Sequence, residues 1–200
     1  MIEEYNKPQE LDFTTSGEGS VTKPNMGNDA VALPTPLTTV DVDIKKIAER
    51  QRQITAKVQI PKENEIVWKV LTDYEALAEF IPNLAKSRKL KHPSGGIRVE
   101  QIGAQRFLGL NFCARVVLDL VEHFPKEISF RMVEGDFKDF YGSWHLEPCS
   151  VGQEIRTNLY YTICIWPKLT MPVSMIERRL SQDLQANLLA VSQRVQQITA

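Results

Sequence analysis

The stretch VWKVLTDYEALAEFIPNL, from Val67 to Leu84, holds two short apolar helical patterns with a polar break between them. Thr72 and Glu75 have the spacing of a capping box, which predicts the end of one helix and the start of the next. Pro82 stops the second pattern. Helices this short are marginal on their own. We therefore expect the segment to grip the end of a larger sheet.

Strand patterns surround this segment. The run from Ile54 to Ile60 alternates apolar and polar residues, as a half-buried strand does. Six further strand-like runs follow, with one apolar parity and short turn-like connections, so they predict an antiparallel meander with one face to bury. These runs cover residues 84–92, 97–107, 111–123, 127–134, 137–147 and 154–166.

The C-terminal segment supplies a cover for the sheet. Apolar residues recur there at spacings of three and four, which predicts a long amphipathic helix, with Asp183 among the polar residues elsewhere on the wheel. The fold expected is therefore α+β: a curved antiparallel sheet of about seven strands around a C-terminal helix, with two short helices after strand 1. The apolar helix positions are Val173, Ile176, Leu180, Leu184, Leu188, Val191, Val195 and Ile198.

Composition divides the chain into two parts. Residues 1–36 are rich in Gly, Pro, Ser, Thr and Asn and lack any period, so we expect a disordered acidic tail before a domain at 37–200. No uncharged apolar run approaches the ~20 residues that cross a bilayer, and the acidic N-terminus lacks the apolar core of a signal peptide. We expect a soluble, cytoplasmic protein, or one of the plastid stroma if the source is a plant or alga.

Catalytic motifs are not evident in the sequence. His92, His123 and His145 are far apart and show no metal-ligand spacing, so we expect neither a metal nor a cofactor. The acidic residues near Lys138 are typical of a solvated hairpin turn, although they could form an acid/base pair. Ser150 lacks the Gly-x-Ser-x-Gly elbow of a nucleophile. We name no catalytic residue, and an enzyme is the less favoured interpretation.

Three stretches carry a family resemblance: VWKVLTDYEALAEFIPNLAKSRKL, FKDFYGSWHLEP and LSQDLQANLLAVSQRV. They resemble the polyketide cyclase/dehydrase and lipid-transport family of START-like (SRPBCC) helix-grip proteins, including its coenzyme Q-binding branch, over about residues 50–198. The resemblance implies a deep apolar cavity between the sheet and the C-terminal helix. The short helices after Val67 would then be its rim and lid.

The cavity implied by the resemblance would be lined by apolar-parity residues; without the resemblance, the same residues fit a solid core. Gly142, between two aromatic residues of one face, would leave room for a ligand. A polar contact with the ligand would come from Arg131, Tyr141 or Thr157. The sequence does not determine which side of the sheet these residues face. The expected lining is Phe80, Phe130, Phe140, Gly142, Trp144, Tyr161, Leu180, Leu184 and Leu188.

A basic run lies just beyond the short helices. Lys86 and Arg88 alternate with Lys89 and Lys91, which puts charge on both faces of a strand and predicts an edge position. These residues could contact an anionic membrane surface or form a plain solvated edge. Aromatic residues are not interleaved with them, so we expect no nucleic-acid partner.

Three functions follow from these observations. The first is binding or transport of a hydrophobic small molecule, such as an isoprenoid quinone, a pigment-like molecule or a lipid. The second is an aromatase/cyclase-type enzyme acting on a hydrophobic substrate, which requires a polar group facing into the cavity. The third is a protein or ribosome interaction module. Fold membership by itself does not select among them.

Overall fold

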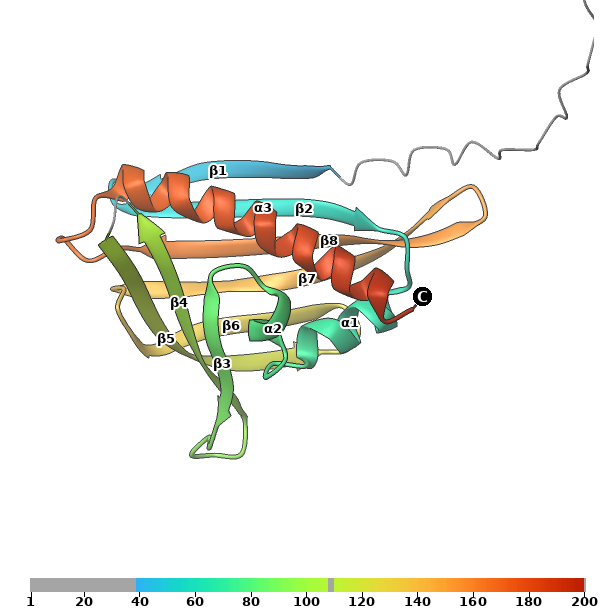
Figure 1. Ribbon diagram of the computed structural model, residues 1–200, viewed down its shortest axis with the longest axis horizontal. Helices are drawn as coiled ribbons and strands as arrows, with labels where there is room; N and C mark the ends of the chain where they lie inside the picture. Colours follow the sequence, from blue (N-terminus) through green and yellow to red (C-terminus); the bar gives the residue numbers. More distant parts are fainter. Residues whose placement is uncertain (1–38, 108–109, 200) are drawn as a thin grey trace, which may run out of the picture. The chain divides into compact units, whose positions relative to one another are not determined.

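The computed structural model describes residues 39–107 and 110–199, with the side chains of residues 105–112 not described. The expected tail at 1–36 lies outside the described residues. One antiparallel sheet contains eight strands in the order β1-β2-β8-β7-β6-β5-β4-β3 (Figure 1). The strands are β1 Val40–Ala48, β2 Gln51–Ile60, β3 Leu84–Leu90, β4 Ile97–Phe107, β5 Leu110–His123, β6 Glu127–Gly135, β7 Asp139–Val151 and β8 Glu154–Trp166.

The meander from β3 to β8 is confirmed, and each of its strands lies within a few residues of the predicted run. The predicted helix-grip arrangement is also confirmed. The sheet gains one strand, since β1 precedes β2 and pairs with it in register Val40↔Val58 and Val42↔Ala56. The two short helices consequently follow the second strand and not the first. β2 then pairs with β8, which brings the first strands beside the last one.

The two short helices are α1, Asn64–Thr72, and α2, Leu77–Phe80. Helix α1 buries Val67, Trp68 and Leu71 against the sheet and α3. The predicted capping box between the helices is wrong. Thr72 lies in the last turn of α1, where its hydroxyl donates to the Trp68 carbonyl at 3.0 Å, and no side chain caps α2. A threonine hydroxyl inside a helix commonly bonds back to the preceding turn in this way.

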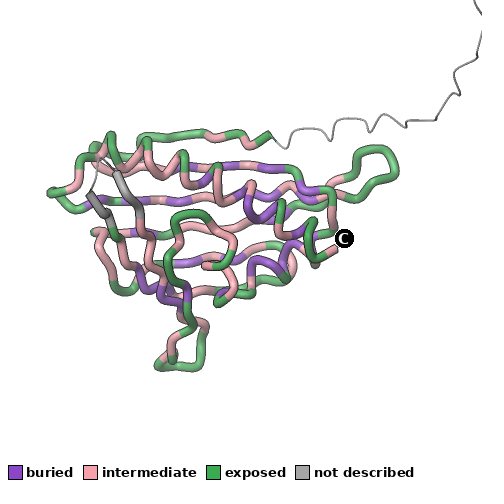
Figure 2. The backbone as a smooth tube through the Cα atoms, in the orientation of Figure 1, coloured by how far each residue is buried: buried purple, intermediate pink, exposed green. Residues whose placement is uncertain are grey.

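The long helix α3, Val173–Gln197, crosses the sheet and packs most closely on β2 and β1 (Figure 1). Its buried residues all lie from Leu184 onward (Figure 2). The first half of the helix is less deeply buried, although Ile176 and Leu180 still pack against the core. Among the described residues, no helix combines the length and the apolar character that a membrane span requires.

The core lies between the sheet and the helices. Fully buried residues of β2 and β8, such as Ile54, Val58 and Leu159, meet Leu188 and Val191 of α3. Burial of such aliphatic side chains contributes about 1.5–3 kcal/mol each. This tightly packed part lies toward the second half of α3. The candidate site lies beneath the middle of α3, at residues 180–191.

Candidate ligand-binding cavity

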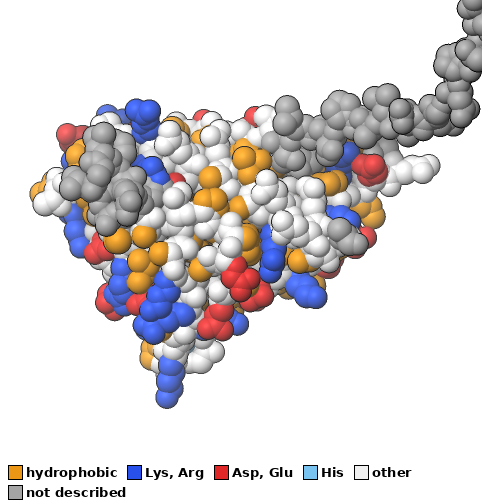
Figure 3. Space-filling view, in the orientation of Figure 1, with side chains coloured by type: hydrophobic (Ala, Val, Ile, Leu, Met, Phe, Trp, Pro, Cys, Tyr) orange, Lys and Arg blue, Asp and Glu red, His pale blue; other side chains and the backbone are white. Residues whose placement is uncertain are grey.

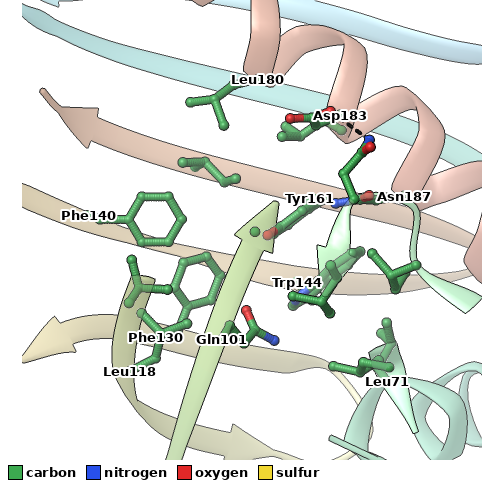
Figure 4. Close-up of a pocket in the computed structure, with 18 of the residues that line it drawn as sticks. Leu71, Gln101, Leu118, Phe130, Phe140, Trp144, Tyr161, Leu180, Asp183 and Asn187 are labelled. Atoms are coloured by element: carbon green, nitrogen blue, oxygen red, sulfur yellow. Dashed lines mark hydrogen bonds between the residues drawn. The ribbon is translucent and has the colours of Figure 1, made fainter. Parts of the chain in front are cut away.

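A cavity of about 220 Å³ lies between the meander and α3 (Figure 4). Strands β4 to β8 form its floor, α3 covers it, and residues from Leu71 to Leu84 close one side. The walls are mostly apolar. The aliphatic lining residues include Leu71, Leu77, Ile81, Leu84, Val116, Leu118, Leu120, Ile128, Ile163, Leu180, Leu184 and Val191.

Aromatic rings make up much of the cavity floor. Tyr161 stacks on Trp144 with 3.6 Å between ring centroids and 6° between ring planes. Phe130 lies against Phe140 at 5.7 Å and against Tyr161 at 6.2 Å, and Phe137 stacks on Phe140 at 5.6 Å. Aromatic pairs at these separations contribute about 0.5–1.5 kcal/mol beyond area burial. The rings of the cavity floor therefore pack against one another in one continuous cluster.

Polar side chains interrupt the apolar wall: Tyr74 and Asn83 at the side formed by residues 71–84, and Gln101 of β4, Tyr161 of β8, and Asp183 and Asn187 of α3 (Figure 4). Burial raises the pKa of the Tyr161 phenol, and the negative charge of Asp183 raises it further. Tyr161 is consequently a neutral phenol at physiological pH. Asn187 Oδ1 is buried and has no hydrogen-bond partner among the described residues.

Residues on both sides of the cavity rim are tied together. Asn83, at φ 62°, donates from its amide to Asp183 Oδ1 at 3.3 Å, and its carbonyl accepts from the Ala104 amide at 2.9 Å. Asparagine tolerates this left-handed backbone conformation better than most residues. Arg194 of α3 lies 3.6 Å from Glu79 of α2. These contacts attach the segment between α1 and β3 to the helix that covers the cavity.

Six of the nine lining residues expected from the sequence line this cavity, namely Phe130, Phe140, Trp144, Tyr161, Leu180 and Leu184. The other three lie elsewhere. Phe80 is half-buried beneath the Arg194 guanidinium, 5.5 Å from its ring centroid. Leu188 is fully buried in the packed core, and Gly142 is not part of the lining.

The role expected for Gly142 is wrong. A Cβ at this position would lie 2.0 Å from the Thr162 carbonyl oxygen and 2.8 Å from Phe130 Cζ. Gly142 pairs with Phe130 across β6 and β7, and the phenyl ring covers its backbone. The glycine therefore permits close approach of a ring and a neighbouring strand, and no ligand space adjoins it.

The polar contacts expected from the sequence are also wrong. Arg131 and Tyr141 are exposed and stack on one another at 5.0 Å, away from the cavity. Thr157 is buried, but its hydroxyl donates to the Lys62 carbonyl at 2.7 Å and also bonds Asn64 Oδ1 at 2.9 Å. Thr157 thus anchors the start of α1, and none of the three lines the cavity.

The sequence interpretation missed the polar lining of the cavity. Asp183 was assigned to another face of the helix, yet residues 180, 183, 184, 187 and 191 follow the spacings of three and four that define one face. Including Asp183 and Asn187 in that stripe would have found them. Gln101 carries no such signal, because a lone glutamine in a strand faces either side equally well.

The basic run occupies an edge strand, as predicted, because β3 ends the sheet (Figure 1). Basic side chains gather on this part of the surface, with acidic ones beside them (Figure 3). Lys86 and Arg88 both pair with the buried Glu100, at 3.4 and 2.6 Å. Lys89 lies over the Tyr74 ring at 5.7 Å. Much of this charge is therefore compensated within the domain.

The histidines do not meet in the structure. His92 lies 3.3 Å from Asp119 and His145 lies 3.4 Å from Glu147, in separate places outside the cavity. Within residues 39–107 and 110–199, no three His, Cys, Asp or Glu side chains come together as metal ligands would. Of the acidic residues around Lys138, Asp139 pairs with Arg131 at 3.0 Å, and Asp136 accepts a hydrogen bond from the Arg115 backbone amide at 2.7 Å.

A curved antiparallel sheet that grips one long helix over an apolar cavity defines the START-like, helix-grip class of proteins. The sequence places the chain within one branch of it. The model of the polyketide cyclase/dehydrase and lipid transport family matches residues 60–189, and the chain belongs to this family. No curated protein matches the chain.

Solved structures share the fold at low sequence identity. The Zhui aromatase/cyclase from Streptomyces sp. R1128 matches with a TM-score of 0.61 and 19% identity, over 75% of this chain and 96% of its own. A START superfamily protein from Mycobacterium smegmatis matches at 0.60 and 16%, over 73% and 98%. A STAR-related lipid transfer protein from Xanthomonas axonopodis matches at 0.55 and 16%, over 78% and 98%.

Proposed function

We propose that this protein binds or carries a hydrophobic small molecule in the cavity between the sheet and α3. The observation that carries the proposal is the cavity itself, walled by interlocked aromatic rings and aliphatic side chains. Ligand sites are typically concave, mostly apolar and equipped with a few convergent polar groups. Family membership supports the same function, since lipid transport is part of the family's description.

The cavity volume limits what enters it whole. At about 220 Å³, it is smaller than the ~300–1,000 Å³ typical of ligand pockets. It suits one or two fused rings. An isoprenoid quinone or a pigment-like molecule would place its ring inside and leave its tail at the rim beside Asn83. A lipid with two long chains fits this conformation less well.

The apolar walls supply part of the binding energy. Removing about 200 Å² of apolar ligand surface from water contributes roughly 5 kcal/mol at ~25 cal/mol per Å². Entropic costs of association reduce this sum. Because about 5 kcal/mol corresponds to a Kd of roughly 0.2 mM before those costs, the apolar walls alone give binding near the millimolar range or weaker, and the polar lining would add to it.

An aromatase/cyclase-type enzyme is the second candidate, and Tyr161 favours it. The phenol faces the cavity, its pKa is raised, and its hydroxyl is placed to donate to a substrate carbonyl (Figure 4). A neutral donor can stabilise an enolate that forms during ring closure. One of the structurally similar proteins is an aromatase/cyclase. Loss of turnover of a reactive polyketide chain in Tyr161→Phe, with binding retained, would support this candidate.

No specific observation supports either of the two remaining interpretations, contact with an anionic membrane surface or binding of a protein or ribosome partner. For an anionic membrane surface, Lys86 and Arg88 are already paired with Glu100, so two of the four charges of the basic run are compensated within the domain. For a protein or ribosome partner, the structure offers no distinct docking surface among the described residues. We therefore retain ligand binding as the main proposal.

The proposal is tested by purifying the protein from its own source, measuring its native mass, and extracting it with organic solvent. We expect one extractable small molecule per chain, or an empty cavity that takes up naphthalene at one molecule per chain in equilibrium dialysis. A protein that carries no extractable molecule and also takes up no naphthalene would contradict the proposal.

A further inference from the structure

The cavity contains polar groups without partners. Asn187 Oδ1 is buried and unpaired, and neither the Tyr161 hydroxyl nor the Gln101 amide has a hydrogen-bond partner among the described residues. All three residues line the same cavity (Figure 4). Buried polar groups in native proteins are nearly always hydrogen-bonded. An unpaired buried group such as Asn187 Oδ1 therefore indicates a place where a water, an ion or a ligand binds.

The charge around the cavity has one sign. Asp183 is the charged residue among the described lining residues, and no lysine, arginine or histidine is among them. Arg179, one turn earlier in α3, approaches Asp183 at 3.4 Å from outside the lining. Asp183 itself lines the cavity, and its negative charge acts with burial to raise the pKa of the Tyr161 phenol. A carboxylate or phosphate placed there would find no cationic partner among the described lining residues.

We propose that the cavity selects an uncharged, hydroxylated ring compound and rejects ligands that carry a carboxylate. This inference rests on the proposed function and narrows it to a class of ligand. A hydroxyl group both donates and accepts, so it can pair with the Asn187 amide in either orientation of that amide. The same hydroxyl, or a carbonyl elsewhere on the ring system, can accept from Tyr161 or Gln101.

The cost of leaving the Asn187 oxygen unpaired favours a hydroxylated ring compound over a plain hydrocarbon. A hydrocarbon ligand fills the apolar space but strips any water from Asn187 and leaves its oxygen unpaired, which carries a desolvation cost. A site with an unpaired buried polar group discriminates strongly against an analogue that lacks the matching group. A carboxylate meets a further cost, since it enters a low-dielectric space beside the Asp183 carboxylate.

Three compounds with the same ring system test the inference: naphthalene, 2-naphthol and 2-naphthoate. Their binding is measured by equilibrium dialysis at neutral pH. We expect 2-naphthol to bind at least about threefold more tightly than naphthalene, within the two- to tenfold range of one net hydrogen bond. We expect 2-naphthoate to bind at least about tenfold more weakly than 2-naphthol. Equal binding of 2-naphthol and 2-naphthoate would overturn the inference.

Two variants assign the selectivity to its residues. Asn187→Leu replaces the amide with an apolar group of the same branching and should bring the affinities of 2-naphthol and naphthalene together, whereas Gln193→Leu, at an exposed position of the same helix, should leave them apart. Asp183→Asn should improve 2-naphthoate binding relative to naphthalene binding. Selectivity that persists in both Asn187→Leu and Asp183→Asn would also overturn the inference.

Failure of this inference can be told apart from failure of the proposed function. If naphthalene binds at one molecule per chain without preference among the three probes, the cavity is a ligand site and only the selectivity is wrong. If none of the three binds, the proposed function fails as well. Circular dichroism of each variant, compared with the wild type, confirms that the fold is retained in every comparison.

Discussion

The phenol ring of Tyr161 lies flat on the indole of Trp144, with 3.6 Å between their centroids, and both rings line the cavity. A ligand in the cavity must therefore contact this stacked pair. Stacking fixes the two rings in one orientation, because rotation of either would lose the contact. The indole becomes an intrinsic reporter of occupancy.

We expect ligand binding to change the fluorescence of Trp144 more than that of the other two tryptophans. Trp68 is buried in α1 against the Phe124 ring, and Trp166 is 38% exposed on the surface. Titration with menthol, a neutral ring alcohol that does not absorb at the excitation wavelength, should alter the emission. Trp144→Phe should abolish this change and Trp166→Phe should preserve it. The reverse pattern would place the ligand outside the cavity.

Gly142→Ala should destabilise the domain by about 1–3 kcal/mol, the usual cost of overpacking. Its Cβ would collide with the Thr162 carbonyl oxygen, which belongs to the sheet and cannot move away cheaply. Gly103→Ala is the matched control, because its nearest atom would lie at 3.7 Å. Urea unfolding of both variants measures the difference. Equal stability of the two would contradict the close approach of β8 and Phe130 to Gly142.

The contact between Asn83 and Asp183 should slow the exchange of ligand. Asn83→Gly removes the amide and keeps the left-handed backbone conformation that the position requires. A net hydrogen bond is worth about 0.5–1.5 kcal/mol, so ligand dissociation should accelerate by roughly two- to tenfold. Stopped-flow displacement measures the rate. An unchanged rate would mean that ligand enters elsewhere.

Glu100 should make stability depend on pH at the acidic end. Hydrogen bonds from Arg115, and then from Arg88, lower the pKa of this carboxyl from its ordinary value of 4.5 to about 2. A lowered folded-state pKa stabilises the fold above the unfolded-state pKa, and that stability is lost as the pH falls from 4.5 toward 2. Glu100→Gln should be less stable at neutral pH, and its deficit should shrink across this interval. A deficit that stays constant with pH would contradict this role.

Much of the fold could be predicted because its signals are local. Alternation along each strand fixed which side chains face inward, and turn-like connections such as FPKE required an antiparallel meander. β1 was not counted as a strand of the sheet, because Lys45 and Lys46 interrupt its alternation and Ile44 is exposed. Its place in the sheet comes from pairing with β2, a contact that only the folded chain shows.

The aromatic part of the site could be predicted from the strand pattern, but the role of Gly142 and the polar lining could not. Aromatic residues of the inner parity, such as Phe130 and Trp144, had to lie beneath the helix once the parity was known. The role of Gly142 depends on how closely β8 and the Phe130 ring approach it, and no spacing in the sequence reports that distance. The polar lining was missed because Asp183 and Asn187 were excluded from an apolar stripe on the basis of their chemistry and not of their position.

The central claim is that the space beneath α3 is a ligand cavity, and a cavity-filling variant tests it most directly. Ala114 lines the cavity from β5, and Ala114→Leu would extend into that space; Val121→Leu, at an exposed position of the same strand, is its control. Equilibrium dialysis with naphthalene, with a thermal melt of each protein, should show binding at one molecule per wild-type chain, at least about tenfold weaker binding in Ala114→Leu, and melting temperatures within a few degrees. A wild type that takes up no naphthalene, together with a markedly destabilised Ala114→Leu, would show that the core is solid and contradict the account.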